Sequence, residues 1–143
     1  MKERKKHLVR YRIRVDVARQ ELYGLEENKV VITAPCSTGS GIASEYGLGT
    51  TPKGCYPITS IVEGREEALL VDPSGRWNPY GPFVAGLGIP GRNIAIHGTD
   101  KPEDLGKPVS AGCIRIRNDL ILKLINDGII SPGTLVEIVG NKP

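Results

Sequence analysis

RYRIRVDV, residues 10–17, alternates polar and apolar side chains without a break. The apolar set is Tyr11, Ile13, Val15 and Val17, and the polar set is Arg10, Arg12, Arg14 and Asp16. Successive side chains of a strand point to opposite faces of a sheet, so this period of two predicts a strand buried on one face. The segment therefore indicates a β protein.

Other strand-like segments follow at short intervals. Residues 20–23 and 29–34 flank the turn-forming stretch Glu26-Glu27-Asn28, which predicts a hairpin. Further strands are expected at residues 56–61, 69–72, 92–97 and 134–139. Residues 37–51 form a glycine-rich loop, and the glycines and prolines of residues 77–91 predict irregular structure.

One helix is expected, over residues 118–127. Leu120, Ile121, Leu124 and Ile125 fall on one face of it. Asn118 or Asp119 can cap its start, and Gly128 stands where a left-handed C-cap is expected. A chain of 143 residues with many short strands and this helix is typical of one mainly β domain, a barrel or a sandwich.

The net charge of +3 is unevenly distributed. Residues 1–14 carry seven Lys or Arg against Glu3, a charge of +6 that leaves −3 for the rest. We interpret residues 1–9 as a basic, solubilising arm and residues 10–140 as the domain. Basic residues without interleaved aromatic side chains do not indicate nucleic-acid binding.

The chain shows neither a secretory signal nor a membrane span. Arginines interrupt the apolar residues after the basic start, and no run approaches the roughly 20 apolar residues of a span. A cytoplasmic protein is therefore one expectation, and an export signal outside this sequence is the other. The three cysteines, Cys36, Cys55 and Cys113, are an odd number and do not resemble a disulfide framework.

The chemistry is concentrated in two short segments. His97-Gly98-Thr99 ends a predicted strand, and Ser110-Ala111-Gly112-Cys113-Ile114-Arg115 follows. A histidine can take the proton of a cysteine thiol and so activate it as a nucleophile. The glycine turn can present backbone N–H groups to an oxyanion, and Arg115 can favour the thiolate or hold a substrate carboxylate. The plainer alternative is a buried Cys113 and a structural His97.

Three other patterns carry less weight. Gly86-x-Gly88-x-x-Gly91 matches a dinucleotide-binding fingerprint, but Pro90 and a following strand replace the helix that such a site needs. A zinc site would need closely spaced ligand pairs, which the cysteines lack. Asp100, Glu103 and Asp104 form an acidic loop, which is a solvated surface or, alternatively, a gate or an amine-binding element.

The two chemical segments together resemble the signature of the L,D-transpeptidase catalytic domain, the YkuD family. Three weaker matches fall in the same order: Ser37-Thr38-Gly39, Thr51-Pro52-Lys53-Gly54 and Gly133-Thr134-x-Val136. The resemblance extends from about residue 10 to residue 139. It implies a closed, mixed β-barrel-like or sandwich-like domain, with the cysteine on a loop over a cleft and one short helix after it.

The resemblance also implies a reaction. Cys113 would attack a carbonyl of a peptidoglycan stem tetrapeptide, release the terminal D-alanine and pass the acyl group from a thioester to an amine. His97 would be the base, and the Gly98 carbonyl would orient it. Ser110, Gly112, Arg115 and Tyr80 would contact the substrate, with Phe83 as a further candidate. No metal or cofactor is implied, and we expect a monomer acting in the cell envelope.

One position departs from the family pattern. Many relatives carry a second histidine where this chain has Ala111.

Two alternative functions remain open. One is transfer of the acyl group to water, which is L,D-carboxypeptidase activity, and the other is a non-catalytic module that binds wall peptides. A catalytic Cys113 is expected to alkylate at a lower pH than an ordinary thiol.

Overall fold

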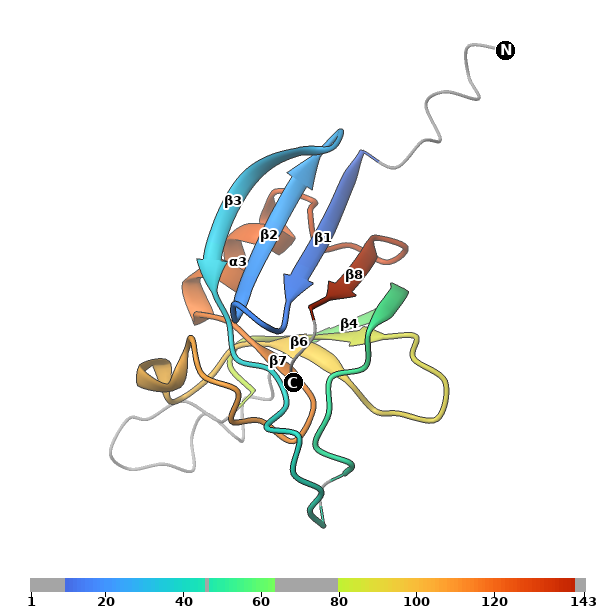
Figure 1. Cartoon of the computed structure of the whole chain (residues 1–143). Helices are drawn as coiled ribbons and strands as arrows, with labels where there is room; N and C mark the ends of the chain where they lie inside the picture. The colour runs from blue at the N-terminus through green and yellow to red at the C-terminus, as the bar shows by residue number, and fades with distance from the viewer. Residues whose placement is uncertain (1–9, 46, 64–79, 141–143) are drawn as a thin grey trace.

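A computed structural model describes residues 10–45, 47–63 and 80–140 (Figure 1). Its strands are β1 (Tyr11–Asp16), β2 (Glu21–Glu26), β3 (Lys29–Pro35), β4 (Gly54–Glu63), β5 (Phe83–Leu87), β6 (Ala95–His97), β7 (Ile114–Arg115) and β8 (Leu135–Val139). They form a single eight-stranded sheet in the order β3-β2-β1-β8-β4-β5-β6-β7. The β1–β8 and β6–β7 pairs are parallel, and the other neighbours are antiparallel.

The hairpin predicted from residues 20–34 is confirmed. β2 and β3 pair from Glu26↔Lys29 to Glu21↔Pro35, with an irregularity after Gly24. Glu27 and Asn28 connect them with φ values of 49° and 72°, the left-handed conformation that two-residue hairpin turns require. Gln20 lies outside β2 and also has a positive φ, so the strand starts one residue later than predicted.

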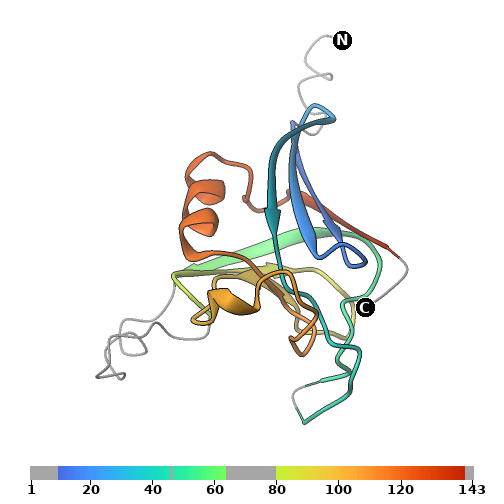
Figure 2. The same ribbon diagram turned by 60° about the vertical axis from the view of Figure 1, so that its left-hand side comes forward.

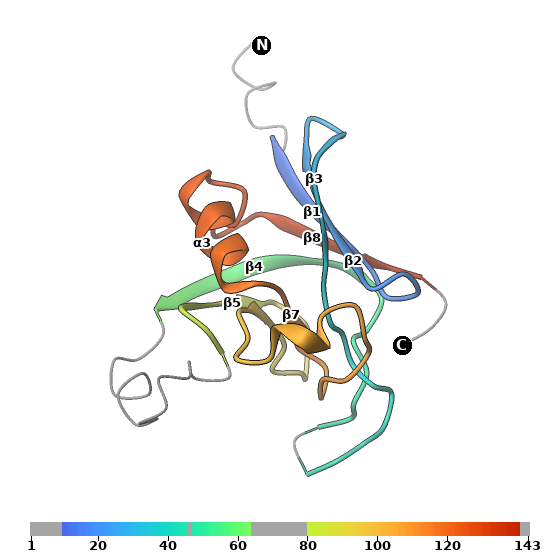
Figure 3. The same ribbon diagram turned by 90° about the vertical axis from the view of Figure 1, so that its left-hand side faces the viewer.

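β4 is the strand over which the sheet bends. Residues 54–57 pair with β8, and the rest of β4 pairs with β5. The two parts of the sheet therefore stand at an angle, and α3 (Asn118–Asn126) lies on the concave side between them (Figures 2 and 3). Leu120, Ile121 and Leu124 of α3 join the apolar side chains of both parts in one core.

The two edges of the sheet are joined by backbone hydrogen bonds just beyond β3, beginning with a bridge between Ser37 and Arg115. Ser37, just after β3, donates its N–H to the carbonyl of Arg115 in β7 at 2.9 Å, and Arg115 N–H returns the bond at 2.9 Å. The curled sheet is therefore a half-barrel whose outer strands are tied together at one end. This confirms the mainly β, barrel-like prediction and shows what the Ser37-Thr38-Gly39 motif contributes to it.

The prediction of irregular structure across residues 77–91 is wrong over Phe83–Leu87, which form β5. Gly86 is in this strand because it pairs with Ser60 of β4 and Ala95 of β6, and a Cβ there would lie 2.7 Å from Ser60 Oγ, which favours glycine. The fingerprint-like glycines thus stand in and after a strand that pairs antiparallel with β6. The strand expected at residues 69–72 and the arm of residues 1–9 lie outside the described residues.

α3 begins as predicted, but its cap differs. Arg117 occupies the N-cap position without a side-chain hydrogen bond, and Asn118 is the first helical residue. Gly128 has a φ of 78°, which confirms the left-handed end of the helix. The short 3-10 helix η1 (Pro102–Asp104) lies between β6 and β7. None of the described helices is both long enough and apolar enough to cross a bilayer.

Candidate active site

The register of β6 and β7 places the predicted catalytic residues on one face. Ile96 pairs with Ile114, and both side chains are completely buried in the core. Because side chains alternate along a strand, His97 and Arg115 point to the opposite face, and Cys113, two residues before Arg115, shares it. All three line one open cleft of about 1190 Å³.

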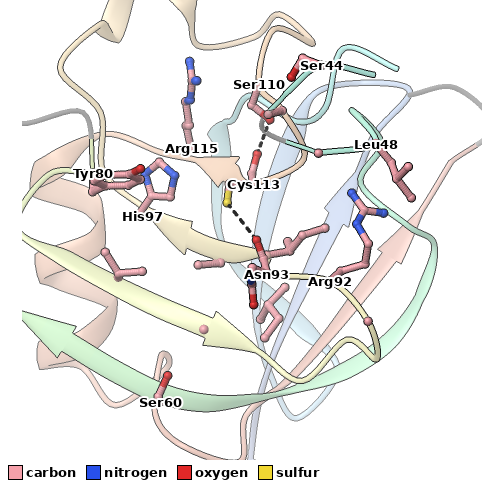
Figure 4. A pocket seen from close by; sticks show the side chains of 18 of the residues that line it. Ser44, Leu48, Ser60, Tyr80, Arg92, Asn93, His97, Ser110, Cys113 and Arg115 are labelled. Atoms are coloured by element: carbon pink, nitrogen blue, oxygen red, sulfur yellow. Dashed lines mark hydrogen bonds between the residues drawn. The ribbon is translucent and has the colours of Figure 1, made fainter. Parts of the chain in front are cut away.

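The cleft has walls from distant parts of the chain (Figure 4). Residues 43–45 and 47–48 of the glycine-rich loop supply one side, and the β5–β6 connection supplies another through Arg92 and Asn93. Cys113 lies among these side chains, with His97 beside the ring of Tyr80 (Figure 4). The loop that carries the cysteine therefore forms part of this cleft.

His97 is held as a neutral base. Its Nδ1 lies 2.6 Å from the carbonyl oxygen of Gly98, which can only accept, so Nδ1 carries the proton and Nε2 has a free lone pair. Tyr80 packs edge-on against the ring, with centroids 5.1 Å apart. Burial lowers the pKa of His97 to about 4, the Gly98 hydrogen bond opposes this, and nearby Arg115 lowers it further. The imidazole is consequently uncharged at neutral pH.

The loop before Cys113 is braced from within. Ser110 is buried, and its hydroxyl donates to the Cys113 carbonyl at 2.6 Å while accepting the Gly112 N–H at 3.0 Å. Thr51, three residues before β4, donates its hydroxyl to the Gly112 carbonyl at 2.7 Å. Gly112 has a φ of 139°, and a Cβ there would lie 3.0 Å from the Thr50 carbonyl oxygen. This position therefore excludes larger residues.

The two backbone N–H groups next to the thiol differ in whether they already donate a hydrogen bond. The Gly112 N–H already donates to Ser110. Within the described residues, the Cys113 N–H donates to no acceptor. Of the turn amides expected to stabilise an oxyanion, the one belonging to Cys113 is therefore available and the one belonging to Gly112 is occupied.

The thiol of Cys113 is protonated in the resting cleft. Its Sγ lies 3.9 Å from the carbonyl oxygen of Asn93, which accepts the weak S–H hydrogen bond (Figure 4). Burial raises the pKa of Cys113, and a backbone hydrogen bond from Ala95 and the charges of Arg115 and Arg92 oppose that rise. This upward shift of the Cys113 pKa is the opposite of the shift needed for the low-pH alkylation that is expected from the sequence. The resting pair is a neutral thiol and a neutral imidazole.

The two arginines of the cleft differ in their hydrogen-bond partners. Arg92 donates to the carbonyl and hydroxyl of Thr50, at 2.7 and 3.2 Å. Among the described residues, the guanidinium of Arg115 has neither an ion pair nor a hydrogen-bond acceptor. A half-buried cation beside a thiol, without a partner in the part of the chain that the structure describes, is suited to an anionic group of a ligand.

The other residues singled out in the sequence divide into two groups. Tyr80 and Ala111 line the cleft. Phe83 and the acidic residues Asp100, Glu103 and Asp104 are not among its lining residues. Cys36 is in the core, where burial raises its pKa to about 12, and Cys55 is exposed on β4. In the described residues, no group of three or more His, Cys, Asp or Glu side chains could hold a metal ion.

Sequence reasoning did not identify three residues around the site. In the sequence, Thr51 stands out only within the Thr51-Pro52-Lys53-Gly54 match, Asn93 only as part of a predicted strand, and Asn118 only as a candidate helix cap. Asn118 Oδ1 instead accepts the Thr99 N–H at 2.8 Å, at the turn that carries His97. No local sequence signal shows such a contact, because it joins residues 19 positions apart.

Comparisons with known proteins identify the family of this chain. The family model of the L,D-transpeptidase catalytic domain, YkuD, matches residues 10–138. YkuD of Bacillus licheniformis, which is assigned as an L,D-transpeptidase, is 33% identical over 129 residues. That alignment covers 90% of this chain and 65% of the relative, so the chain spans just under two thirds of that protein.

Solved structures show the same fold. An L,D-transpeptidase fragment from Xylanimonas cellulosilytica superposes with a TM-score of 0.68 at 22% identity, covering 92% of this chain and 61% of that one. L,D-transpeptidase 3 from Mycobacterium tuberculosis, in complex with a faropenem-derived adduct, gives 0.63 at 18% identity, covering 90% and 60%. With the family model matching nearly the whole length, this chain belongs to the L,D-transpeptidase catalytic domain family.

Proposed function

We propose that this domain transfers acyl groups of peptidoglycan stem tetrapeptides through a thioester on Cys113. The observation that supports this most is the shared face of β6 and β7, which presents the Cys113 thiol and an unprotonated His97 Nε2 to one cleft. The family membership supplies the substrate class. The geometry supports the roles of the individual groups.

In the first half-reaction, the sulfur of Cys113 attacks the carbonyl that precedes the terminal D-alanine. The thiol proton passes to Nε2 of His97, and the Cys113 N–H donates to the oxyanion that forms. When the intermediate collapses, the C–N bond breaks, and the imidazolium gives its proton to the departing amine of D-alanine. The products are a thioester on Cys113, free D-alanine and a neutral His97.

In the second half-reaction, an acceptor amine attacks the thioester carbonyl. His97 removes a proton from the nitrogen as the new C–N bond forms, and the C–S bond breaks. The sulfur leaves as a thiolate and regains its proton from the imidazolium. A diamino-acid side chain gives a cross-link and a D-amino acid gives an exchanged stem, whereas water gives the carboxypeptidase product.

A neutral resting pair is consistent with this sequence of steps. The raised pKa of Cys113 and the lowered pKa of His97 both disfavour a stored thiolate–imidazolium pair. Proton transfer then accompanies attack on a bound substrate, with His97 acting as a general base. The charge of Arg115, which opposes the rise in the Cys113 pKa, also stabilises the developing thiolate character.

We assign Arg115 to a carboxylate of the stem peptide, since its guanidinium has no acceptor among the described residues. Tyr80 is 55% exposed at the edge of the cleft and can pack against the peptide while holding the His97 ring. Ser110 and Gly112 fix the backbone of the loop that carries Cys113 through their hydrogen bonds. Their direct contribution to substrate binding remains a prediction.

The proposal is tested by the products of a defined tetrapeptide stem. The parent protein and Cys113→Ala would each be incubated with the stem, both with and without an added D-amino acid. The products would be identified by mass spectrometry. Exchange of D-alanine that depends on Cys113 supports transfer, and loss of D-alanine in both conditions supports hydrolysis. Tight binding of the stem without any product supports the non-catalytic module instead.

A further inference from the structure

One peptide group is held at both ends beside the catalytic histidine. It is the unit joining Gly98 to Thr99. Its carbonyl accepts the His97 Nδ1–H at 2.6 Å, and its N–H donates to Asn118 Oδ1 at 2.8 Å. The contact between His97 and α3 therefore runs through a single rigid unit.

The planarity of that unit links the two hydrogen bonds. The C=O and N–H of a trans peptide lie in one plane and point in opposite directions. An acceptor that fixes the direction of the Thr99 N–H thereby fixes the direction of the Gly98 carbonyl. Donation by the N–H also polarises the carbonyl and strengthens the bond that it accepts. The tautomer of His97 depends on that carbonyl, because the group bonded to one ring nitrogen determines which nitrogen carries the proton.

The surroundings of Asn118 are shaped to admit its amide. A Cβ built on Gly98 or on Gly81 would collide with Asn118 Oδ1, at separations that atoms cannot adopt. Gly81 also has a φ of 69°, and the Gly98 N–H donates to the Tyr80 carbonyl at 2.9 Å. Two glycines thus form a cradle for the amide oxygen, and the cradle is held together by a backbone hydrogen bond.

The place of Asn118 in the chain connects it to the cysteine. It is the first residue of α3, three positions after Arg115 of β7. The same short segment therefore carries the cysteine loop at one end and the histidine support at the other.

We propose that Asn118 is a positioning residue, which holds His97 with its proton on Nδ1 and so keeps Nε2 free to receive the Cys113 proton. The part of this inference that concerns proton transfer rests on the proposed function. The part that concerns the tautomer does not, and it can be measured without any substrate.

The direct measurement is the nitrogen-15 NMR spectrum of the imidazole rings. The chain has two histidines, His7 and His97, so a His7→Ala background leaves one ring to assign. In the parent, the expected spectrum shows a protonated Nδ1 and an unprotonated Nε2. Asn118→Ala is expected to give a mixture of tautomers. Asn118→Asp keeps an oxygen acceptor at the same place and is expected to restore the parent tautomer.

Asp119→Ala is the matched control, because Asp119 is the next residue of α3 and pairs on the surface with Arg117 at 3.1 Å. It is expected to leave the tautomer unchanged. If Asn118→Ala does not fold, Asn118→Ser replaces it, since the shorter side chain removes the reach to the Thr99 N–H. An unchanged tautomer in a folded Asn118 variant without the acceptor overturns the proposal.

Kinetics supply the second reading. Asn118→Ala is expected to lower kcat about tenfold, the loss typical of residues that orient a functional histidine, with little change in KM. Asn118→Asp is expected to recover most of kcat and to move the acidic limb of the pH profile upward, because its charge stabilises the imidazolium. A parent-like kcat in Asn118→Ala contradicts the positioning role. If no form of the protein turns over stem peptides, the proposed function fails while the tautomer measurement still decides this inference.

Discussion

The hydroxyl of Ser110 donates to the carbonyl oxygen of Cys113 across 2.6 Å, closing the four-residue loop on itself. The same hydroxyl oxygen accepts the N–H of Gly112 at 3.0 Å. One buried side chain therefore fixes the backbone on both sides of the peptide bond that precedes the nucleophile. The position of the Cys113 N–H, the proposed oxyanion donor, depends on this brace.

Ser110→Ala is expected to destabilise the fold and impair catalysis together. The change leaves the buried Gly112 N–H without its acceptor, which costs about 1–3 kcal/mol of unfolding free energy. The released loop lets the Cys113 N–H move, so kcat should fall. Ser60→Ala, another serine lining the cleft but remote from the loop in sequence, is the control. Equal unfolding free energies for Ser110→Ala and Ser60→Ala in urea titrations would refute the brace.

Stability should depend on pH through His97. Its pKa is about 4 in the folded state against an ordinary value of 6.5, so between these values the unfolded chain binds the proton more readily. The stabilisation is complete above pH 6.5 and is lost as the pH falls towards 4. The shift corresponds to about 3 kcal/mol. His97→Gln should show a correspondingly smaller loss of unfolding free energy between pH 7 and pH 4.5. Identical pH slopes for the two proteins would exclude this role for His97.

The role of Arg115 can be read from paired changes in protein and substrate. Arg115→Gln keeps polarity and approximate size but removes the charge, so KM for the stem peptide should rise. Amidating the stem carboxylate that Arg115 binds should raise the parent KM similarly and have little further effect on the variant. The carboxylates of the stem are amidated one at a time. Additive losses for every carboxylate would show that Arg115 binds none of them.

A carbapenem should modify one of the three thiols. Its strained carbonyl is an acyl donor, so attack by Cys113 opens the β-lactam ring and leaves a thioester of the whole drug. Cys36 is buried with a pKa of about 12 and should remain unmodified. Peptide mapping by mass spectrometry locates the adduct, and Cys113→Ser, lacking the thiol, is the control. An adduct on Cys36 would contradict the assignment of the nucleophile.

Local patterns predicted the parts of the fold that depend on neighbouring residues. The alternation in residues 10–17 and the turn at Glu27 and Asn28 correspond directly to β1 and to the β2–β3 hairpin. β5 could not be predicted in this way. Gly86 is typical of a loop in the sequence, yet in the sheet it pairs with Ser60 of β4 and Ala95 of β6. Such a glycine is explained only by its partner strand.

The site also has features that the sequence predicts and features that only the tertiary structure shows. His97 and Cys113 could be identified from residue type and motif, and the register of β6 and β7 then explains why they share a face. The upward shift of the Cys113 pKa could not be predicted from the sequence, because it depends on how deeply the thiol is buried. Asn118 has the composition of a helix start, and only the tertiary structure shows its amide at the histidine turn.

The most direct test of the central claim is the fate of D-alanine in a tetrapeptide stem incubated with the parent protein and with Cys113→Ala. The account predicts that the parent releases D-alanine, or exchanges it for an added D-amino acid, through a transient protein adduct of the tripeptide acyl mass. It predicts that Cys113→Ala, folded by circular dichroism, does neither. Equal release by the two proteins, or no release by a folded parent with a reduced thiol, would contradict it.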